Sequence, residues 1–484
     1  MRGVYMTEIK VPEDVARILE KLENAGFEAY AVGGAIRDSL LGLVPHDWDV
    51  CTSARPDEMM TVFSDCRIIP TGLKHGTLTV MMQTEKFTEN KDSRSTGARD
   101  KAETKTENRT DAAPDSEKVF VEVTSFRRES SYSDARRPDR VEFVKSIEED
   151  LARRDFTMNA IAYSPLRGMV DPFGGQKDLS AGVLRCVGDA AERFSEDALR
   201  ILRALRFLSA RDLVPEEQTR AAIQAQYESL SSVSWERITD EFLRLICGKN
   251  AASVLDAYRD VFAYLIPELK ATFDFDQRSP YHNRDVWHHT LAGLSDIPPV
   301  PELRMTMLLH DIAKPVVCVL DDNGRGRFVG HPQKGAEMAE IILKRMKFSN
   351  QKIEKITKLI KYHDVKLKPE RPDVRRILSV FGEEGFFDLL AVKHADAAGK
   401  YEKYLAEAEK KNEALRACAE EVLRDGDCIS LKTLAVSGAD LRRAGLPEGP
   451  DIGRILNRLL DEVIDGTLEN EKSALLGAAK ESLR

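Results

Sequence analysis

The sequence has no apolar run that approaches the length of a membrane span, which argues against a membrane-embedded protein. Residues 1–15 lack the apolar core of a secretion signal, so we expect a cytoplasmic location. The seven cysteines are odd in number, scattered and never spaced as CxxC. This pattern excludes a disulfide framework and a zinc ribbon and is typical of a reducing compartment.

Net positive charge is also missing, because the 484 residues carry a formal net charge of −9. Such a balance argues against a protein that coats nucleic acid non-specifically. Residues 151–211 differ from this average, with ten lysines and arginines against seven aspartates and glutamates. Most of these cations are arginines, whose planar fork donates hydrogen bonds in pairs to phosphates and base edges. A local basic groove is therefore compatible with the acidic total.

Hydrophobic periodicity divides the chain into a mixed N-terminal part and a helical remainder. Apolar spacing predicts a helix over residues 11–26 and strands over 28–33, 47–51, 77–82 and 119–126. From residue 190 onward, apolar residues at i, i+3 and i+4 predict helices almost throughout. Residues 84–118 contain one Phe and no Leu, Ile or Val, so we expect a disordered insertion between two strands.

The sharpest chemical signal lies at residues 33–49, where GGAIRD is followed by the DWD of residues 47–49. A glycine pair between a strand and a short helix leaves backbone N–H groups available to hold phosphates. Asp47 and Asp49 alternate along an extended segment, so their carboxylates point to the same side. Proteins hold Mg²⁺ through one or two carboxylates, with substrate phosphates as further ligands. The combination predicts nucleotidyl transfer from a nucleoside triphosphate.

Two further segments offer candidate residues. Glu122 lies in the predicted strand 119–126 and is a candidate third carboxylate for a metal site, with an exposed strand residue as the equally weighted alternative. Residues 153–160, RRDFTMNA, place two arginines beside an Asp and an Asn that could line the sugar and phosphates of a nucleotide. Taken alone, this segment favours the simpler interpretation of a salt-bridged helix start at the surface.

One predicted helix carries a charged stripe whose members recur every three positions: Asp197, Arg200, Arg203 and Arg206. Three arginines against one aspartate are poorly balanced for a solvated face and suit an anionic ligand. An Asp that accepts and an Arg that donates, side by side, match the amino and ring-nitrogen pattern shared by cytosine and adenine. Uracil and guanine present the reverse order and would leave the pair unsatisfied, which costs more than a lost contact.

These motifs together resemble a known family. GGAIRD, HDWDV, RRDFTMNA, DPFGG and EDALRILRALRF, in this order and spacing, resemble the bacterial-type (class II) CCA-adding enzymes and poly(A) polymerases. These are tRNA nucleotidyltransferases of the polymerase-β-like superfamily. The resemblance runs from about residue 28 to residue 260 and resumes at residues 437–476.

The resemblance implies an α+β fold, with a polymerase-β-like nucleotidyltransferase head on a mixed sheet followed by an all-helical neck, body and tail. The implied domains are the head at 1–180 with its insertion at 84–118, an RNA- and nucleotide-binding neck at 181–265, an HD-type body at 275–400 and a tail at 401–484. DPFGG at 171–175 resembles the hinge between head and neck. Residues 127–143 resemble the flexible loop that full CCA-adding enzymes need for the final A, which favours CCA addition over addition of CC only.

The resemblance also implies site residues and ligands. Asp47 and Asp49 would bind Mg²⁺, and with the candidate Glu122 they form the expected catalytic group. The expected nucleotide contacts are Gly33, Gly34, Arg37, Arg154, Asp155, Asn159, Asp197, Arg200, Arg203 and Arg206. Asp197 and Arg200 match the family's protein template for CTP and ATP. The implied macromolecular partner is tRNA, no membrane is involved, and monomer and homodimer are both left open.

A second group of chemically capable residues lies in the helical part. Seven of the nine histidines fall between residues 282 and 394. Imidazoles and carboxylates from different helices can converge on a divalent metal, and the candidate ligands are His289, His310, Asp311, His331, His363 and Asp396. Together they resemble the HD phosphohydrolase superfamily, which implies a second divalent metal. An active phosphohydrolase and a purely structural body both remain open.

Three alternatives to CCA addition stay open at the level of sequence. Within the same class, a poly(A) polymerase or an A-adding enzyme has nearly the same head motifs. In another class, a metal-dependent phosphohydrolase acting on RNA ends would use the histidine region as its main site. A non-enzymatic RNA-binding module is the weakest alternative, because a binding protein does not need paired carboxylates beside a phosphate-binding turn.

Overall fold

The computed structural model describes residues 9–70, 72–73, 76–82, 119–130, 140–280 and 284–481. The chain forms two compact units, one of Met1–Arg200 and Leu213–Gln226 and the other of Ile201–Asp212 and Tyr227–Arg484. Within the described ranges, no helix has both the length and the apolar character needed to cross a bilayer. The finer division into head, neck, body and tail stays a prediction, and the insertion at 84–118 lies outside the described residues.

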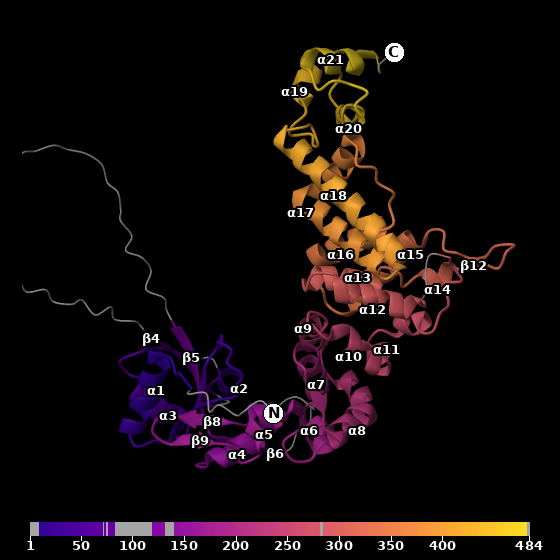
Figure 1. The fold of residues 1–484 in the computed structure, drawn as a ribbon. Coiled ribbons are helices and arrows are strands. Elements are labelled where there is room, and N and C mark those ends of the chain that lie inside the picture. Colours follow the sequence, from indigo (N-terminus) through magenta and orange to yellow (C-terminus); the bar gives the residue numbers. More distant parts are fainter. Residues whose placement is uncertain are drawn as a thin grey trace, which may run out of the picture. The chain divides into compact units, whose positions relative to one another are not determined.

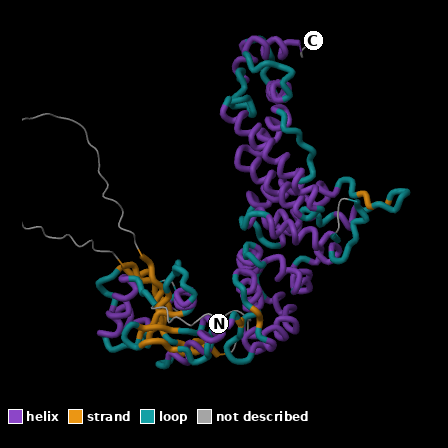
Figure 2. The backbone as a smooth tube through the Cα atoms, viewed as in Figure 1, coloured by secondary structure: helices purple, strands orange, loops and turns teal. Residues whose placement is uncertain are grey.

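The first unit is built on a seven-stranded mixed sheet (Figures 1 and 2). In spatial order its strands are β3 (Arg67–Ile69), β4 (Thr77–Met82), β5 (Val119–Ser125), β2 (Asp49–Thr52), β1 (Ala29–Val32), β8 (Ala162–Ser164) and β9 (Gly168–Val170). The β2–β5 pair is parallel, and the other pairs are antiparallel. This confirms the predicted mixed sheet and the four predicted strands, whereas β3, β8 and β9 had not been predicted.

Both faces of the interior strand β1 are covered, so all four of its residues are buried. Ala29 and Ala31 join a core with α1 (Glu13–Asn24), α2 (Gly34–Leu40) and α3 (Pro56–Val62). Tyr30 and Val32 point to the opposite face, where they join a core with α4 (Ile147–Ala152). Successive side chains of β1 point to opposite faces because a strand has a two-residue period. Packing on both faces holds β1 in place, and with it the turn that follows.

The remaining elements of this unit are short. They are β6 (Arg127–Ser130), β7 (Arg140–Phe143), the 3₁₀ helix η2 (Thr157–Asn159), α5 (Gly175–Ala181), β10 (Val183–Leu184), α6 (Ala190–Glu196), β11 (Val214–Pro215) and α8 (Glu217–Gln226). Helix α7 (Leu199–Ala210) begins in this unit and continues into the second one. Gly175 allows α5 to approach η2 closely, because a Cβ there would lie 2.1 Å from the carbonyl oxygen of Thr157.

The second unit is almost entirely helical (Figure 2), as the apolar spacing predicted. Its first part holds η3 (Tyr227–Ser232), α9 (Trp235–Ile246), α10 (Ala251–Ala257), α11 (Arg259–Leu265) and η4 (Pro267–Thr272). The next part holds α12 (Val286–Asp296), α13 (Pro301–Leu309), α14 (Lys314–Val317), the hairpin β12 (Val319–Leu320) and β13 (Gly326–Arg327), α15 (His331–Arg345), α16 (Asn350–Tyr362) and α17 (Arg371–Ala398). Gly382, with φ of +71°, interrupts the helical geometry of α17.

The C-terminal part contains a long helix and a small helical module with its own core. The long helix is α18 (Glu402–Arg424), which packs along α17. The module comprises α19 (Gly438–Arg443), α20 (Pro450–Ile464) and α21 (Lys472–Glu481). Leu441, Leu459 and Leu475 are fully buried in its core, so the module contributes apolar burial of its own.

Candidate active site and a histidine cluster

The glycine turn lies where β1 meets α2, as the sequence predicts. Gly33 has φ of +72°, a left-handed conformation that favours glycine. A Cβ at this position would lie 2.9 Å from Nη1 of Arg154, so the absence of a side chain lets the guanidinium approach the turn. One small region of the first unit therefore holds both the backbone of the glycine pair and the charge of Arg154.

Two of the three predicted acidic residues occupy neighbouring strands. Asp49 is the first residue of β2 and lies opposite Val32, the last residue of β1 before the glycine turn. On its other side, Asp49 is in register with Glu122 of β5. Asp47 lies two residues before β2 and is exposed. The acidic residues thus gather near the ends of the interior strands β1 and β2, where the glycine turn also lies.

The environment of Asp49 favours a bound cation. Its side chain reaches solvent, yet enough protein surrounds it that burial, together with the charges of Glu122 and Asp47, raises the pKa of Asp49. The positive charge of Arg154 opposes this shift. A divalent cation would relieve the repulsion among these carboxylates, and hard oxygen donors suit Mg²⁺. The residues present therefore fit the expected metal.

A chain of hydrogen bonds connects three of the predicted nucleotide contacts. Arg37 Nη1 donates to Oδ1 of Asn159 at 2.7 Å, and Nδ2 of Asn159 donates to Oδ1 of Asp155 at 2.9 Å. Asp155 and Asn159 are buried, so their orientation is fixed by these partners. The sequence had suggested a surface salt-bridged helix start as the simpler interpretation of this segment. Burial of Asp155 and Asn159 instead favours an ordered polar site.

Arg154 lies between the turn and the metal-site strand. Its Nη2 donates to Sγ of Cys51, which is two residues beyond Asp49 on β2, at 3.4 Å. The same Nη2 lies 3.3 Å from Oδ2 of Asp150. Within the described part of the chain, its buried Nε has no hydrogen-bond partner. An arginine held in this way retains a donor for an anionic ligand.

Asp197 and Arg200 lie at the junction of α6 and α7. Asp197 Oδ1 accepts a hydrogen bond from the backbone N–H of Leu199 at 3.1 Å, which orients its carboxylate at the start of α7. Arg200 is only 9% exposed. Its Nη1 donates to the Arg193 carbonyl oxygen at 3.1 Å and to Glu196, and its Nη2 donates to the Arg153 carbonyl oxygen at 3.0 Å. These three bonds hold the guanidinium, and among the described residues the other two of its five donors have no partner.

Arg203 and Arg206 belong to the second unit. Arg206 pairs with Glu241 of α9, and its guanidinium lies 4.1 Å from the ring centroid of Phe207. Arg203 lies 6.0 Å from the same ring. Carboxylates outside the stripe thus balance part of the charge that the sequence left unbalanced: Glu196 for Arg200 and Glu241 for Arg206. A nucleotide contact for Arg203 and Arg206 stays a prediction.

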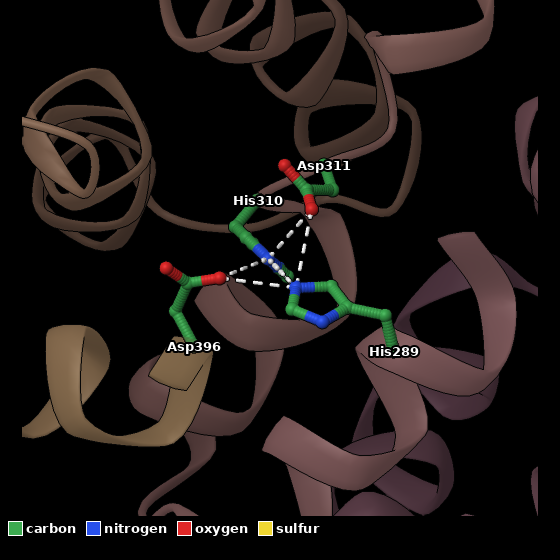
Figure 3. Close-up of side chains that lie close together, drawn as sticks. All are labelled: His289, His310, Asp311 and Asp396. Carbon is green, nitrogen blue, oxygen red and sulfur yellow. Dashed lines mark hydrogen bonds and ion pairs between the residues drawn. The ribbon is translucent and has the colours of Figure 1, made fainter. Parts of the chain in front are cut away.

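The six candidate ligands of the histidine region come together in the second unit. Figure 3 shows four of them, His289, His310, Asp311 and Asp396. The six come from five places along the chain: His289 on α12, His310 and Asp311 after α13, His331 at the start of α15, His363 after α16, and Asp396 on α17. All six side chains are buried. In the described residues, the groups whose ligating atoms lie within 4.8 Å of one another are His289–His310–Asp311–Asp396 and Asp311–His331–His363.

Asp311 belongs to both groups of ligands. Its Oδ2 lies 3.1 Å from Nε2 of His310 and 3.3 Å from Nε2 of His289. Its Oδ1 lies 3.5 Å from Nε2 of His331 and 3.7 Å from Nε2 of His363. Two nitrogens bound tetrahedrally to one ion at ~2.1 Å would lie about 3.4 Å apart. The His289–His310 and His331–His363 Nε2 pairs are separated by 3.4 and 3.3 Å, so this geometry fits metal ions.

Three of the histidines are oriented by the same backbone contact. Nδ1 of His310, His331 and His363 lies 2.7, 2.8 and 2.7 Å from the carbonyl oxygen three residues earlier. An Nδ1–H donated to that carbonyl leaves Nε2 as the lone-pair atom that faces the cluster, which is how metal-binding histidines are commonly oriented. Burial lowers the pKa of His310, but the charges and hydrogen bonds of Asp311 and Asp396 together outweigh it and raise the pKa to about 9.

The cluster opens into a cavity of about 1300 Å³ within the second unit. Asp311, His331, His363 and Asp396 form part of its wall. Cations also line it: Lys314, Arg325, Arg327, Lys361, Lys366, Lys393, Lys400 and Lys411. An accessible group of metal-binding side chains below a cationic wall suits a phosphate-containing ligand.

Asp150 is the residue of the first unit that sequence reasoning missed. It lies on α4 and contacts both Arg153 and Arg154 through its carboxylate. The i, i+3 and i, i+4 spacing to two arginines was a usable signal. It looked like an ordinary surface pair, and the sequence alone did not reveal that Asp150 would be fully buried.

Family models match most of the chain. The model described as the poly A polymerase head domain matches residues 29–118 and 96–185. A model for an RNA and SrmB binding site of polymerase A matches residues 212–273, and one for tRNA nucleotidyltransferase domain 2 matches residues 332–479. The first match covers the sheet, the second covers the elements from β11 to η4, and the third covers the C-terminal helices.

Similar proteins and structures extend along the whole chain. A CCA-adding enzyme of Lactobacillus delbrueckii is 32% identical over 97% of this chain and 98% of its own length, and one of Lacticaseibacillus paracasei is 33% identical over 96% and 95%. The crystal structure of the Bacillus stearothermophilus CCA-adding enzyme in complex with CTP superposes with a TM-score of 0.69 at 27% identity, covering 98% of this chain and 97% of that one. This chain therefore belongs to the family of CCA-adding enzymes.

Proposed function

We propose that the protein adds C, C and A to the 3′ end of tRNA, taking CTP and ATP as substrates without a nucleic-acid template. The observation that carries this proposal is the arrangement of Asp49, which lies between Glu122 on one side and the strand leading to the glycine turn on the other. This arrangement brings acidic ligands for a cation close to backbone groups for phosphates, at one end of the strands β1 and β2. A tRNA substrate agrees with the cytoplasmic location expected from the sequence.

Asp47 and Asp49 are the residues that would hold two divalent cations, with Mg²⁺ as the proposed identity and Glu122 as a third carboxylate. When bound, such cations activate the terminal 3′-OH and neutralise the charge of the triphosphate and of the leaving pyrophosphate. The chain itself contributes the positive charge of Arg154, whose Nη1 lies against the glycine turn. Its position against the glycine turn suits the triphosphate.

We assign the contacts with the ribose and the base of the nucleotide to other residues of the first unit. The chain from Arg37 through Asn159 to Asp155 offers ordered polar groups for the ribose. Asp197 offers a carboxylate, and Arg200 offers two donors without a partner in the described residues, for the edge of cytosine or adenine. The helical body and tail would bind the acceptor arm of tRNA by its shape and backbone charge rather than by its sequence.

Nucleotide incorporation by the full-length protein tests this function and separates it from its relatives. With tRNA that lacks its 3′ end, we expect two residues to be added from CTP alone and a third after ATP is supplied. An A-adding enzyme would incorporate only ATP, and only onto tRNA that already ends in CC. A poly(A) polymerase would extend the RNA with many A residues. Either of these results would overturn CCA addition.

A second candidate activity is favoured by the histidine cluster. We propose that its six side chains hold divalent metal and serve a phosphohydrolase that acts on RNA ends. The two groups of ligands share Asp311, and the cluster opens into a cavity with a cationic wall. A metal bound there would activate water and polarise a phosphoryl oxygen. The chain would contribute cationic side chains on the cavity wall to hold the phosphate ester in place.

Metal binding at the cluster gives a prediction independent of activity. Dialysis of the protein against Mn²⁺ or Zn²⁺ should leave metal bound to the second unit and raise its melting temperature. At a free metal concentration 100-fold above Kd, linkage supplies about 2.7 kcal/mol of stabilisation. Asp311→Asn removes the ligand shared by both groups and should abolish this increase, as measured by elemental analysis and differential scanning calorimetry.

The matched control is His394→Ala. His394 lies on the same helix as Asp396 but pairs with Asp296 at 3.3 Å, and it belongs to neither group of ligands. This variant should bind as much metal as the unmodified protein. A wild-type protein that takes up no divalent metal, or an Asp311→Asn variant that takes up the full amount, would contradict a metal site.

A further inference from the structure

Asp150 occupies an unusual place for a carboxylate. It lies on α4 of the first unit and is 0% exposed. Its Oδ1 accepts from Nη2 and Nε of Arg153 at 2.8 and 3.0 Å and from the backbone N–H of Arg127 at 3.3 Å. Its Oδ2 lies 3.3 Å from Nη2 of Arg154 and 3.7 Å from Sγ of Cys51. One buried charge is therefore shared between two neighbouring guanidinium groups.

Both arginines favour the ionised form of this carboxylate. Burial alone would raise the pKa of Asp150, but the charges of Arg153 and Arg154 hold it below its ordinary value. A buried ion group of this kind loses much of its stability when one member is removed, because the others remain unpaired. The positions of Arg153 and Arg154 are therefore coupled through Asp150.

Each of the two arginines, Arg153 and Arg154, contacts a different end of the proposed nucleotide site. Arg154 contacts Cys51 on the strand that begins at Asp49, and it lies against the glycine turn at Gly33. Arg153 presents its backbone carbonyl to Nη2 of Arg200, the proposed base reader, at 3.0 Å. Bonds from the Arg153 side chain to Asp150 fix the orientation of this residue and hence of its carbonyl group.

We infer that Asp150 is a positioning residue that connects the phosphate end of the site, through Arg154, with the base-reading end, through Arg153 and Arg200. It touches neither nucleotide nor metal ligand and acts only through its neighbours. The inference rests on the proposed nucleotidyl transfer and on the roles proposed there for Arg154 and Arg200. It adds that affinity for the triphosphate and choice of base depend on one shared carboxylate.

Asp150→Asn tests this connection because it keeps the shape of the side chain and removes the charge. Errors of about 1 Å in the position of reacting groups can lower rates by about 100-fold. We expect kcat/KM for CTP to fall by about that factor in full-length protein acting on tRNA without its 3′ end. The ratio of CTP to UTP incorporation should fall in the same variant, by ~10-fold or more, since Arg200 loses part of its support.

Asp178→Asn is the matched control. Asp178 is a nearly buried carboxylate of the same unit, 8% exposed, that accepts from Oγ1 of Thr157 at 2.8 Å and from Nε of Arg185 at 3.1 Å. It contacts neither Arg153 nor Arg154 in the described structure. Its loss should lower the melting temperature without changing the CTP-to-UTP ratio. If Asp150→Asn lowers only the melting temperature in the same way, Asp150 has a merely structural role and the inference is wrong.

If Asp150→Asn does not fold, Arg153→Met tests the same inference. It keeps the Asp150–Arg154 pair and removes only the side-chain anchor of residue 153. The CTP-to-UTP ratio should fall while KM for CTP stays within about threefold of the wild-type value, because Arg154 keeps its partner. An unchanged ratio would overturn the inference. A wild-type protein that adds no nucleotide to tRNA would instead overturn the proposed function itself.

Discussion

Replacing Asp49 with asparagine is expected to lower the rate of nucleotide addition by at least roughly 1000-fold, while the stability of the first unit stays the same or increases. The large effect follows from the loss of a carboxylate that would hold a divalent cation, since such charge stabilisation supplies several kcal/mol and each 1.36 kcal/mol corresponds to about tenfold in rate. The measurement is single-turnover addition of CMP to tRNA without its 3′ end.

The expected stability follows from the sign of the pKa shift. Burial, together with the charges of Glu122 and Asp47, raises the pKa of Asp49 in the folded protein. An acid whose pKa is higher in the folded state than in the unfolded state costs stability when it is ionised, and this cost appears as pH rises through the two values. Asparagine carries no charge, so the variant should unfold at an equal or higher temperature than the wild-type protein at pH 7.

Asp57→Asn is a suitable control, because Asp57 is an exposed acid on α3 of the same unit. This variant should keep the wild-type rate. Asp49→Asn should also leave any metal-dependent phosphohydrolase activity of the histidine cluster intact, since the cluster lies entirely in the second unit. A rate for Asp49→Asn within about tenfold of wild type would place the chemistry elsewhere.

The second large effect is expected at Asp197. Asp197→Asn should reduce the preference for CTP over UTP by about 100-fold, because a buried polar group left unpaired costs ~1–3 kcal/mol or more. The amide can donate a hydrogen bond to O4 of uracil where the carboxylate only accepts, so the mismatch at this position is removed and only the Arg200 donor still opposes the uracil N3–H. Its remaining oxygen can still accept from the Leu199 backbone N–H, which preserves the start of α7.

Competition between labelled CTP and UTP on the same tRNA measures this preference directly. Asp189→Asn is the control, since Asp189 caps the preceding helix α6 by accepting from the Glu192 backbone N–H at 2.9 Å. Both variants change a helix-capping aspartate, but only Asp197 lies beside Arg200 in sequence and in the proposed template. Equal CTP-to-UTP ratios in the two variants would refute base reading by Asp197.

Much of this architecture could be predicted from local sequence patterns. Short apolar segments identified β1, β2, β4 and β5, and apolar spacing identified the helices from α6 onward, because these signals depend on neighbours along the chain. The short strands β3, β8 and β9 were missed, since three residues are too few for a periodic signal. The six candidate ligands of the histidine cluster were found because several histidines gather in one helical region, a pattern uncommon enough to stand out.

Contacts between distant segments could not be predicted in the same way. The Arg206–Glu241 pair joins α7 to α9, and without it the stripe of arginines looked unbalanced. The burial of Asp150 depends on packing of α4 against the sheet, which no local pattern encodes. The Arg200 guanidinium donates three hydrogen bonds, to residues 153, 193 and 196. The sequence could therefore indicate that Arg200 contacts a base, but not which residues orient its guanidinium.

A crystal structure of the full-length protein with CTP and Mg²⁺ tests the central claim most directly. The account predicts that the Watson–Crick edge of cytosine lies against Asp197 and Arg200, that the triphosphate lies at the turn of Gly33 and Gly34 beside Arg154, and that Asp47 and Asp49 share a bound ion. A cytosine ring bound away from residues 197 and 200, or carboxylates at 47 and 49 that share no ion, would contradict it.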